Sequence, residues 1–227
     1  MHRALLTISI SLIGWGLAGC GSPKPIKYYA LQIPAVPASP SHTNAIDLVV
    51  SRVSGSDLME ASPIVYKTGA HEVGTYEYHR WTGAPTEMVQ EKLIQLLRKS
   101  GEFRSVVGSD SRTGGTAKGD GLVLRSRLYE FSEVDGDSIQ GLVTMEFELY
   151  NRTSSKVVWT HFYSQTEPVP TKAVTAVVQA IDQNLDRGLN EVVAELTKYT
   201  TANPSVKSGT PATAGERPEH NEHDHPW

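Results

Sequence analysis

The sequence has one cysteine, Cys20, in 227 residues. An exported domain with a single cysteine cannot form an internal disulfide, so the thiol is either free or modified. The sequence also has no excess of positive charge, since 21 Lys and Arg residues are set against 25 Asp and Glu residues. Nucleic-acid binding requires a basic face, and the nearest approach to a basic cluster is Arg125 with Arg127. We therefore expect no nucleic-acid partner.

Long hydrophobic runs are absent as well. A membrane-spanning helix needs about 18 or more apolar residues, and the longest candidate, residues 4–18, is too short. A weakly basic start and a short apolar core are typical of a secretory signal peptide. The segment ends in Leu-Ala-Gly-Cys at residues 17–20, which resembles the bacterial lipobox. The resemblance implies that Cys20 becomes the lipidated N-terminus; the alternative is an ordinary signal peptide with a chance cysteine at the cut.

A lipid-anchored Cys20 would attach the mature chain to a membrane without a spanning helix, because two or more acyl chains suffice for stable anchoring. By the sorting rule of bacterial lipoproteins, Gly21 after the cysteine favours the outer membrane over the inner membrane. We therefore expect the protein at the periplasmic face of the outer membrane. Four regions are predicted: a signal peptide at 1–19, the lipidated cysteine and a Pro-rich tether at 20–43, a folded domain at 44–200, and a disordered tail at 201–227.

The folded region has a mixed pattern of strands and helices. Alternating apolar residues predict strands, and apolar residues at helical spacing predict two helices. Strands are expected at residues 45–53, 63–67, 73–80, 103–107, 122–133, 139–150 and 157–166, and helices at 86–100 and 172–199. The second helix has a long apolar stripe, which should cover the apolar face of the sheet. The predicted fold class is α+β: a single domain with an antiparallel or mixed β-sheet backed by two α-helices.

Signals for catalysis are weak. No Gly-x-Ser-x-Gly, phosphate-binding loop or His-Glu-x-x-His motif occurs. Asp135 and Asp137 flank Gly136 and are interpreted as turn residues, and His79 and His161 as structural residues. We expect no catalytic residue, no cofactor and no metal site.

Three histidines near the C-terminus, His220, His223 and His225, are spaced so that they could bind zinc or nickel. A flexible tail must become ordered to do so. Weak adventitious binding or a solvated tail is therefore the preferred interpretation.

An aromatic and basic group ends the third predicted strand: Tyr76, Arg80 and Trp81. Two interpretations are open. Trp81 can close the core where the strand leads into the first helix. Alternatively, the three residues form a partner-binding patch, because aromatic and arginine side chains are enriched at protein interfaces.

Several segments resemble the ABC-type transport auxiliary lipoprotein family, the PqiC-like components of MCE-type lipid transport systems. The similar segments are the lipobox, Tyr-Tyr-Ala-Leu at 28–31, Leu-Val-Val-Ser-Arg-Val at 48–53, Pro-Ile-Val-Tyr-Lys at 63–67, and Tyr-Glu-Tyr-His-Arg-Trp at 76–81. The chain departs from the family pattern at 55–60, where a proline of many relatives is missing.

The resemblance implies a non-catalytic outer-membrane subunit that docks an MCE/ABC-type phospholipid transport assembly to the outer membrane. Its implied partners are an MCE-domain protein and the associated permease and ATPase, and a homo-oligomer is compatible with the sequence. The alternative is an envelope-integrity or outer-membrane assembly lipoprotein that binds a β-barrel or peptidoglycan.

Overall fold

The computed structural model describes residues 23–33, 35, 46–110 and 121–204. The predictions for the signal peptide, Cys20 and the C-terminal histidines fall outside these residues. No helix among the described residues is long and apolar enough to cross a membrane.

The predicted elements are all present, with ends shifted by a few residues. The strands are β1 (Lys27–Tyr29), β2 (Asp47–Val50), β3 (Pro63–Thr68), β4 (Glu72–Trp81), β5 (Ser105–Gly108), β6 (Leu122–Asp135), β7 (Gln140–Asn151) and β8 (Lys156–Pro168). The helices are α2 (Pro85–Ser100) and α3 (Val174–Ala202). The expectation of a single α+β domain with a mixed sheet and two helices is confirmed.

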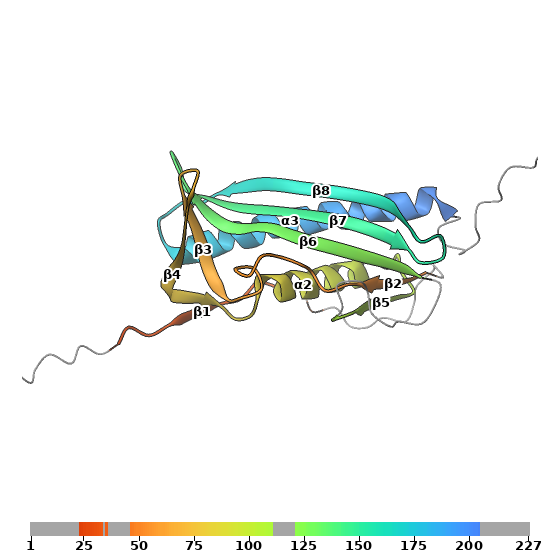
Figure 1. Ribbon diagram of the computed structural model, residues 1–227, viewed down its shortest axis with the longest axis horizontal. Coiled ribbons are helices and arrows are strands. Elements are labelled where there is room, and N and C mark those ends of the chain that lie inside the picture. Colours follow the sequence, from red (N-terminus) through yellow and green to blue (C-terminus); the bar gives the residue numbers. More distant parts are fainter. Residues whose placement is uncertain (1–22, 34, 36–45, 111–120, 205–227) are drawn as a thin grey trace, which may run out of the picture.

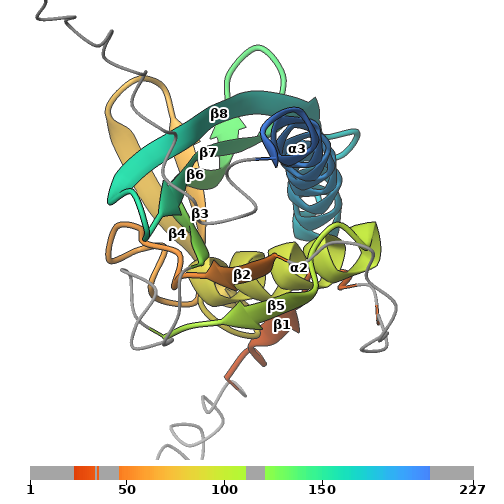
Figure 2. The same ribbon diagram turned by 90° about the vertical axis from the view of Figure 1, so that its right-hand side faces the viewer.

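The sheet is organised around β6. One edge of this strand pairs with β7 along nearly its whole length in antiparallel register, and β7 pairs in turn with β8. The opposite edge of β6 pairs in parallel with β2 at one end and with β3 at the other. β4 and β1 extend the sheet beyond β3, and β5 extends it beyond β2. Figures 1 and 2 show the resulting curved sheet, with both helices on its inner side.

Helix α3 covers the inner face of the long strands (Figure 1). Its apolar stripe is buried as predicted, and β7 contributes the matching alternating apolar residues. The buried members of these two rows are Val177, Ile181, Leu185, Leu189, Val192 and Leu196 on α3, and Val143, Met145, Phe147 and Leu149 on β7. The other face of β7 carries Glu146 and Glu148, which are partly exposed. The face of β6 and β7 opposite α3 is therefore polar and reachable by solvent.

Helix α2 begins with a proline, Pro85, and ends before Gly101, whose φ of 68° gives the left-handed cap that a glycine adopts without steric cost.

Helix α2 also carries a buried charged side chain. Lys92 is 0 % exposed, and its ammonium lies 2.5 Å from Asp182 Oδ1 and 2.7 Å from Asp186 Oδ1 on α3. This cluster joins the two helices because a buried ammonium requires acidic partners.

The N-terminal segment docks onto this framework. β1 pairs in parallel with β4, from Lys27 opposite His79 to Tyr29 opposite Trp81. Leu31 is buried at 6 % exposure, and the Gln32 backbone N–H donates to Asp182 Oδ2 at 3.1 Å. This part of the region expected as a tether is therefore a short strand followed by a docked segment.

Candidate functional site

A polar cleft among the described residues lies beside the edge of β6 that both β2 and β3 pair with. Between its β2-paired and β3-paired ends, β6 meets the loop after β2 at one isolated bridge, from Ser54 to Arg127. The backbone N–H of Ser54 donates to Ser126 O, and the N–H of Leu128 donates to Ser54 O. No regular strand lies along the middle of this edge among the described residues, and a cleft opens beside it.

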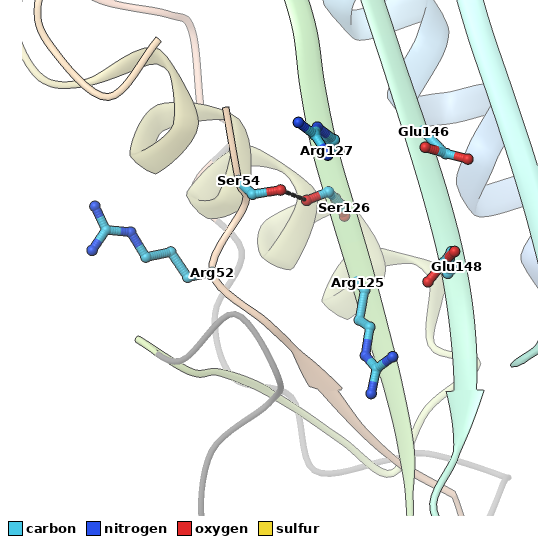
Figure 3. A pocket seen from close by; sticks show the side chains of 7 residues that line it. All are labelled: Arg52, Ser54, Arg125, Ser126, Arg127, Glu146 and Glu148. Atoms are coloured by element: carbon cyan, nitrogen blue, oxygen red, sulfur yellow. Dashed lines mark hydrogen bonds between the residues drawn. The ribbon is translucent and has the colours of Figure 1, made fainter. Parts of the chain in front are cut away.

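This feature, called here the β6 cleft, has a volume of about 220 Å³. Its lining residues are all polar or charged, and Figure 3 shows their side chains. They are Arg52 and Ser54 from the loop after β2, Arg125, Ser126 and Arg127 from β6, and Glu146 and Glu148 from β7. Residues that are 73 positions apart in the sequence, such as Arg52 and Arg125, therefore line one site.

Opposite charges face one another across β6 and β7. Arg125 is in register with Glu148, and Arg127 with Glu146. Such cross-strand pairs stabilise a sheet by roughly 0.2–1 kcal/mol each. Alternation along β6 places both arginines on the solvent side, whereas Leu124 and Leu128 point into the core.

Two tyrosines hold the arginine side chains. The Arg125 guanidinium lies over the Tyr150 ring, 4.0 Å from its centroid, and that of Arg127 lies 5.2 Å from the Tyr129 centroid. Tyr129 donates its hydroxyl to Glu146 Oε2 at 2.6 Å, and this hydrogen bond raises the pKa of Tyr129. The arginines and glutamates are thus fixed by neighbours on the same face.

Arg52 lines the cleft from the loop on the side of β6 away from β7, and its guanidinium points away from β6 (Figure 3). One of its terminal nitrogens lies 3.7 Å from Glu60 Oε2, a loose ion pair. The Nε atoms of Arg52 and Arg125 are both shielded from solvent and have no hydrogen-bond partner among the described residues.

The residues singled out on β4 lie in a different place. Trp81 is 1 % exposed and packs against Phe131, with 5.2 Å between ring centroids. A partner could not touch this side chain without opening the core, so the burial favours the first interpretation of Trp81. The indole completes the core at the point where β4 leads into α2.

Tyr76 and Arg80 are partly buried, and their polar groups are engaged within the fold. Tyr76 donates its hydroxyl to Glu133 Oε2 at 2.6 Å. Burial, followed by this hydrogen bond, raises the pKa of Tyr76 above the ordinary value of 10.0. The Arg80 guanidinium turns back onto its own strand and donates to the carbonyl oxygens of Tyr76 and His79.

The remaining candidates are scattered. Asp135 and Asp137 occupy the exposed end of the β6–β7 hairpin. His79 Nδ1 lies 2.8 Å from the Tyr29 hydroxyl, and His161 Nε2 lies 3.1 Å from Glu191 Oε1 without hydrogen-bond geometry. The two aspartates share a turn, and each histidine contacts a different residue outside this group.

Sequence reasoning noticed Arg125 and Arg127 as a pair but missed Arg52, Glu146 and Glu148 as their neighbours. The signal for the glutamates was present, because alternation in β7 places both on its wet face. Arg52 carried no such signal, since its position depends on the irregular path of a loop.

Comparisons with known proteins agree with this fold. The model of the ABC-type transport auxiliary lipoprotein component family matches residues 29–193. No curated protein sequence matches the chain. The structure of protein XCC0632 from Xanthomonas campestris is similar, with a TM-score of 0.68 at 16 % identity over 79 % of this chain and 99 % of that one. A second crystal structure, of an uncharacterized protein, gives a TM-score of 0.61 at 14 % identity over 76 % and 99 %.

At these identities the two structures establish a shared fold and nothing more. The family model spans the sheet, the first helix and most of the second, from the end of β1 to within α3. The chain belongs to the family of ABC-type transport auxiliary lipoprotein components.

Proposed function

We propose that the protein is a non-catalytic, lipid-anchored subunit of an MCE-type ABC lipid transport system, and that it docks the transport assembly to the outer membrane. The observation that carries this proposal is the family match over residues 29–193, which describes an auxiliary component of ABC-type transport. The lipobox at residues 17–20 and Gly21 support attachment to the outer membrane.

The way the N-terminus joins the domain supports a docking role. A tether that ended in a loose loop would leave the domain free to turn relative to its anchor. Here β1 and Leu31 are packed into the domain before the chain enters residues 36–45. The membrane-proximal end is therefore fixed at the β1–β4 edge of the sheet.

Arg80 and Tyr76 are the proposed partner contacts on this side of the molecule, since both lie on β4 and β1 pairs with this strand at Arg80. Arg80 is partly exposed, and its guanidinium would have to exchange backbone carbonyls for an acidic partner group. Trp81 would act through the core, as a residue that holds β4 in place.

A pull-down of envelope MCE-domain protein tests the proposal. The bait is the full-length lipoprotein, solubilised in mild detergent with added lipid. Wild type, Arg80→Ala, Trp81→Ala and the exposed control Arg104→Ala are compared, and each variant is melted in parallel. Arg80→Ala should fold normally and lose capture by about thirtyfold if it is a central contact.

Trp81→Ala should instead lower stability by about 3–5 kcal/mol, because it deletes a large core side chain. Arg104→Ala should behave as wild type, since Arg104 pairs with Asp47 at the far end of the sheet. If the wild-type protein captures no MCE-domain protein, the transport assignment fails.

A further inference from the structure

We propose that the β6 cleft binds a singly charged tetrahedral oxyanion, either a free phosphate or the phosphodiester of a lipid headgroup. This inference rests on the cleft itself and is independent of the proposed MCE partner. Three arginines, two glutamates and two serines line the cleft. Guanidinium groups are the preferred ligands of phosphate because their planar N–H fork matches its oxygens.

The first argument concerns hydrogen bonds that the protein leaves unmade. The Nε atoms of Arg52 and Arg125 are shielded from solvent and have no acceptor among the described residues. A charged donor that has lost water without gaining an acceptor is unfavourable, so native proteins rarely leave one. Oxygens of a ligand in the cleft would supply the missing acceptors.

The second argument is the charge of the lining. The lining residues carry three guanidinium groups and two carboxylates, an excess of one positive charge, and Glu60 outside the lining forms a loose ion pair with Arg52 at 3.7 Å. The site can therefore compensate a single negative charge at most, and a dianion would leave a negative charge beside Glu146 and Glu148. The two glutamates therefore select against multiply charged phosphates as well as orienting Arg125 and Arg127.

The third argument is size and shape. A volume of about 220 Å³ is below the roughly 300–1,000 Å³ typical of pockets for drug-sized ligands. The lining side chains all end in polar or charged groups, which suits a headgroup better than an acyl chain. Its arginines come from the loop after β2 and from two positions along β6 (Figure 3), and a tetrahedral anion can accept hydrogen bonds from groups on more than one side.

Part of the site is already held in place. Arg125 is stacked on Tyr150 at 4.0 Å, so its guanidinium loses little freedom when a ligand binds. Ser54 Oγ donates to Ser126 O at 3.4 Å, which ties the loop that carries Arg52 to β6.

Calorimetric titration of the full-length protein in a non-ionic detergent tests the proposal. The probes are inorganic phosphate, at a pH where the monoanion dominates, and glycerophosphoglycerol, the deacylated headgroup of a phosphodiester lipid. Acetate and glycerol are the matched controls for a planar anion and for an uncharged polyol. We expect saturable binding of at least one phosphate probe, weakened by added salt. The tighter of the two probes identifies the source of the ligand.

Two variants with opposite expected effects on affinity test whether the probe binds in the β6 cleft. Arg125→Gln should weaken the affinity by about tenfold, because it removes a charge-assisted contact. Glu148→Gln should strengthen it, because it removes the carboxylate opposite Arg125, a result that a purely structural role would not give. Arg187→Gln, on α3 behind the sheet, is the matched control and should leave binding unchanged. Arg127→Gln replaces Arg125→Gln if thermal melts show that the latter is unfolded.

The proposal is overturned if neither phosphate probe binds, or if acetate binds as tightly as either of them. It is also overturned if a folded arginine variant binds as wild type does, or if Glu148→Gln fails to strengthen binding.

Discussion

The carboxylate of Glu133 is 5 % exposed and accepts a hydrogen bond from the Tyr76 hydroxyl at 2.6 Å. Removing one partner of a buried polar pair leaves the other without its partner, which costs more than the pair itself contributes. We therefore expect Tyr76→Phe to lower the free energy of unfolding by about 1–3 kcal/mol. Urea denaturation measures this change, and Tyr129→Phe, on the solvent-exposed face of the sheet, should cost less.

The same hydroxyl makes stability depend on alkaline pH. The pKa of Tyr76 is raised in the folded state, so the native protein holds this proton more tightly than the unfolded chain does. The resulting stability is complete below the ordinary value of 10.0 and is lost as the pH rises above it. Tyr76→Phe should reduce this alkaline loss without abolishing it, because burial also raises the pKa of Tyr29 and Tyr199. An unchanged alkaline slope in the variant would contradict this assignment.

At the scale of elements, the contact between α2 and α3 depends on Lys92. Replacing it with methionine leaves Asp182 and Asp186 facing each other without the ammonium between them. Breaking one side of a buried ion pair costs about 3–5 kcal/mol, so Lys92→Met should be strongly destabilised. Thermal unfolding checks this, with Lys99→Met on the exposed side of α2 as the control. If the variant is as stable as wild type, the cluster of Lys92, Asp182 and Asp186 makes no net contribution to the stability of the fold.

The packing of α3 on the sheet depends on a glycine. A Cβ added at Gly141 would lie 2.9 Å from the Ile181 backbone nitrogen, so the helix would have to move away from β7. Gly141→Ala should therefore cost about 1–3 kcal/mol. Gly136→Ala, at the hairpin end where nothing lies within 4 Å, is the control and should be close to neutral. Guanidinium unfolding curves of the two variants should separate clearly.

The helices and strands could be predicted from the sequence more fully than the way the strands pair with one another. The apolar stripes of α3 and β7 follow from residue spacing alone, because one buried face imposes its period on the sequence. Spacing says nothing about pairing, so the parallel alignment of both β2 and β3 with one edge of β6 could not be foreseen. The β6 cleft depends on that pairing, which is why Arg52 was missed. Trp81 was noticed in the sequence, but its residue type could not decide its role, because tryptophan is common both in cores and at interfaces.

At the scale of the whole molecule, Cys20 is predicted to determine where the protein resides. Cys20→Ala should abolish incorporation of radiolabelled palmitate, because the thiol is the acceptor of the diacylglyceryl group. The mature variant should then appear in the periplasmic fraction, because the acyl chains on Cys20 are its expected anchor. Gly21→Asp is the matched variant: it should stay lipidated and shift to the inner membrane. Continued membrane association of Cys20→Ala would refute the anchor.

The docking of β1 also bears on how the molecule carries mechanical load. A pull on the N-terminal end of the described chain reaches β1 first, where three residue pairs with β4 share the force. Behind it lie buried Leu31 and the hydrogen bond from Gln32 to Asp182, whose carboxylate also pairs with Lys92. We therefore expect the three-residue pairing of β1 with β4 to separate under load before the contacts between the two helices are disturbed.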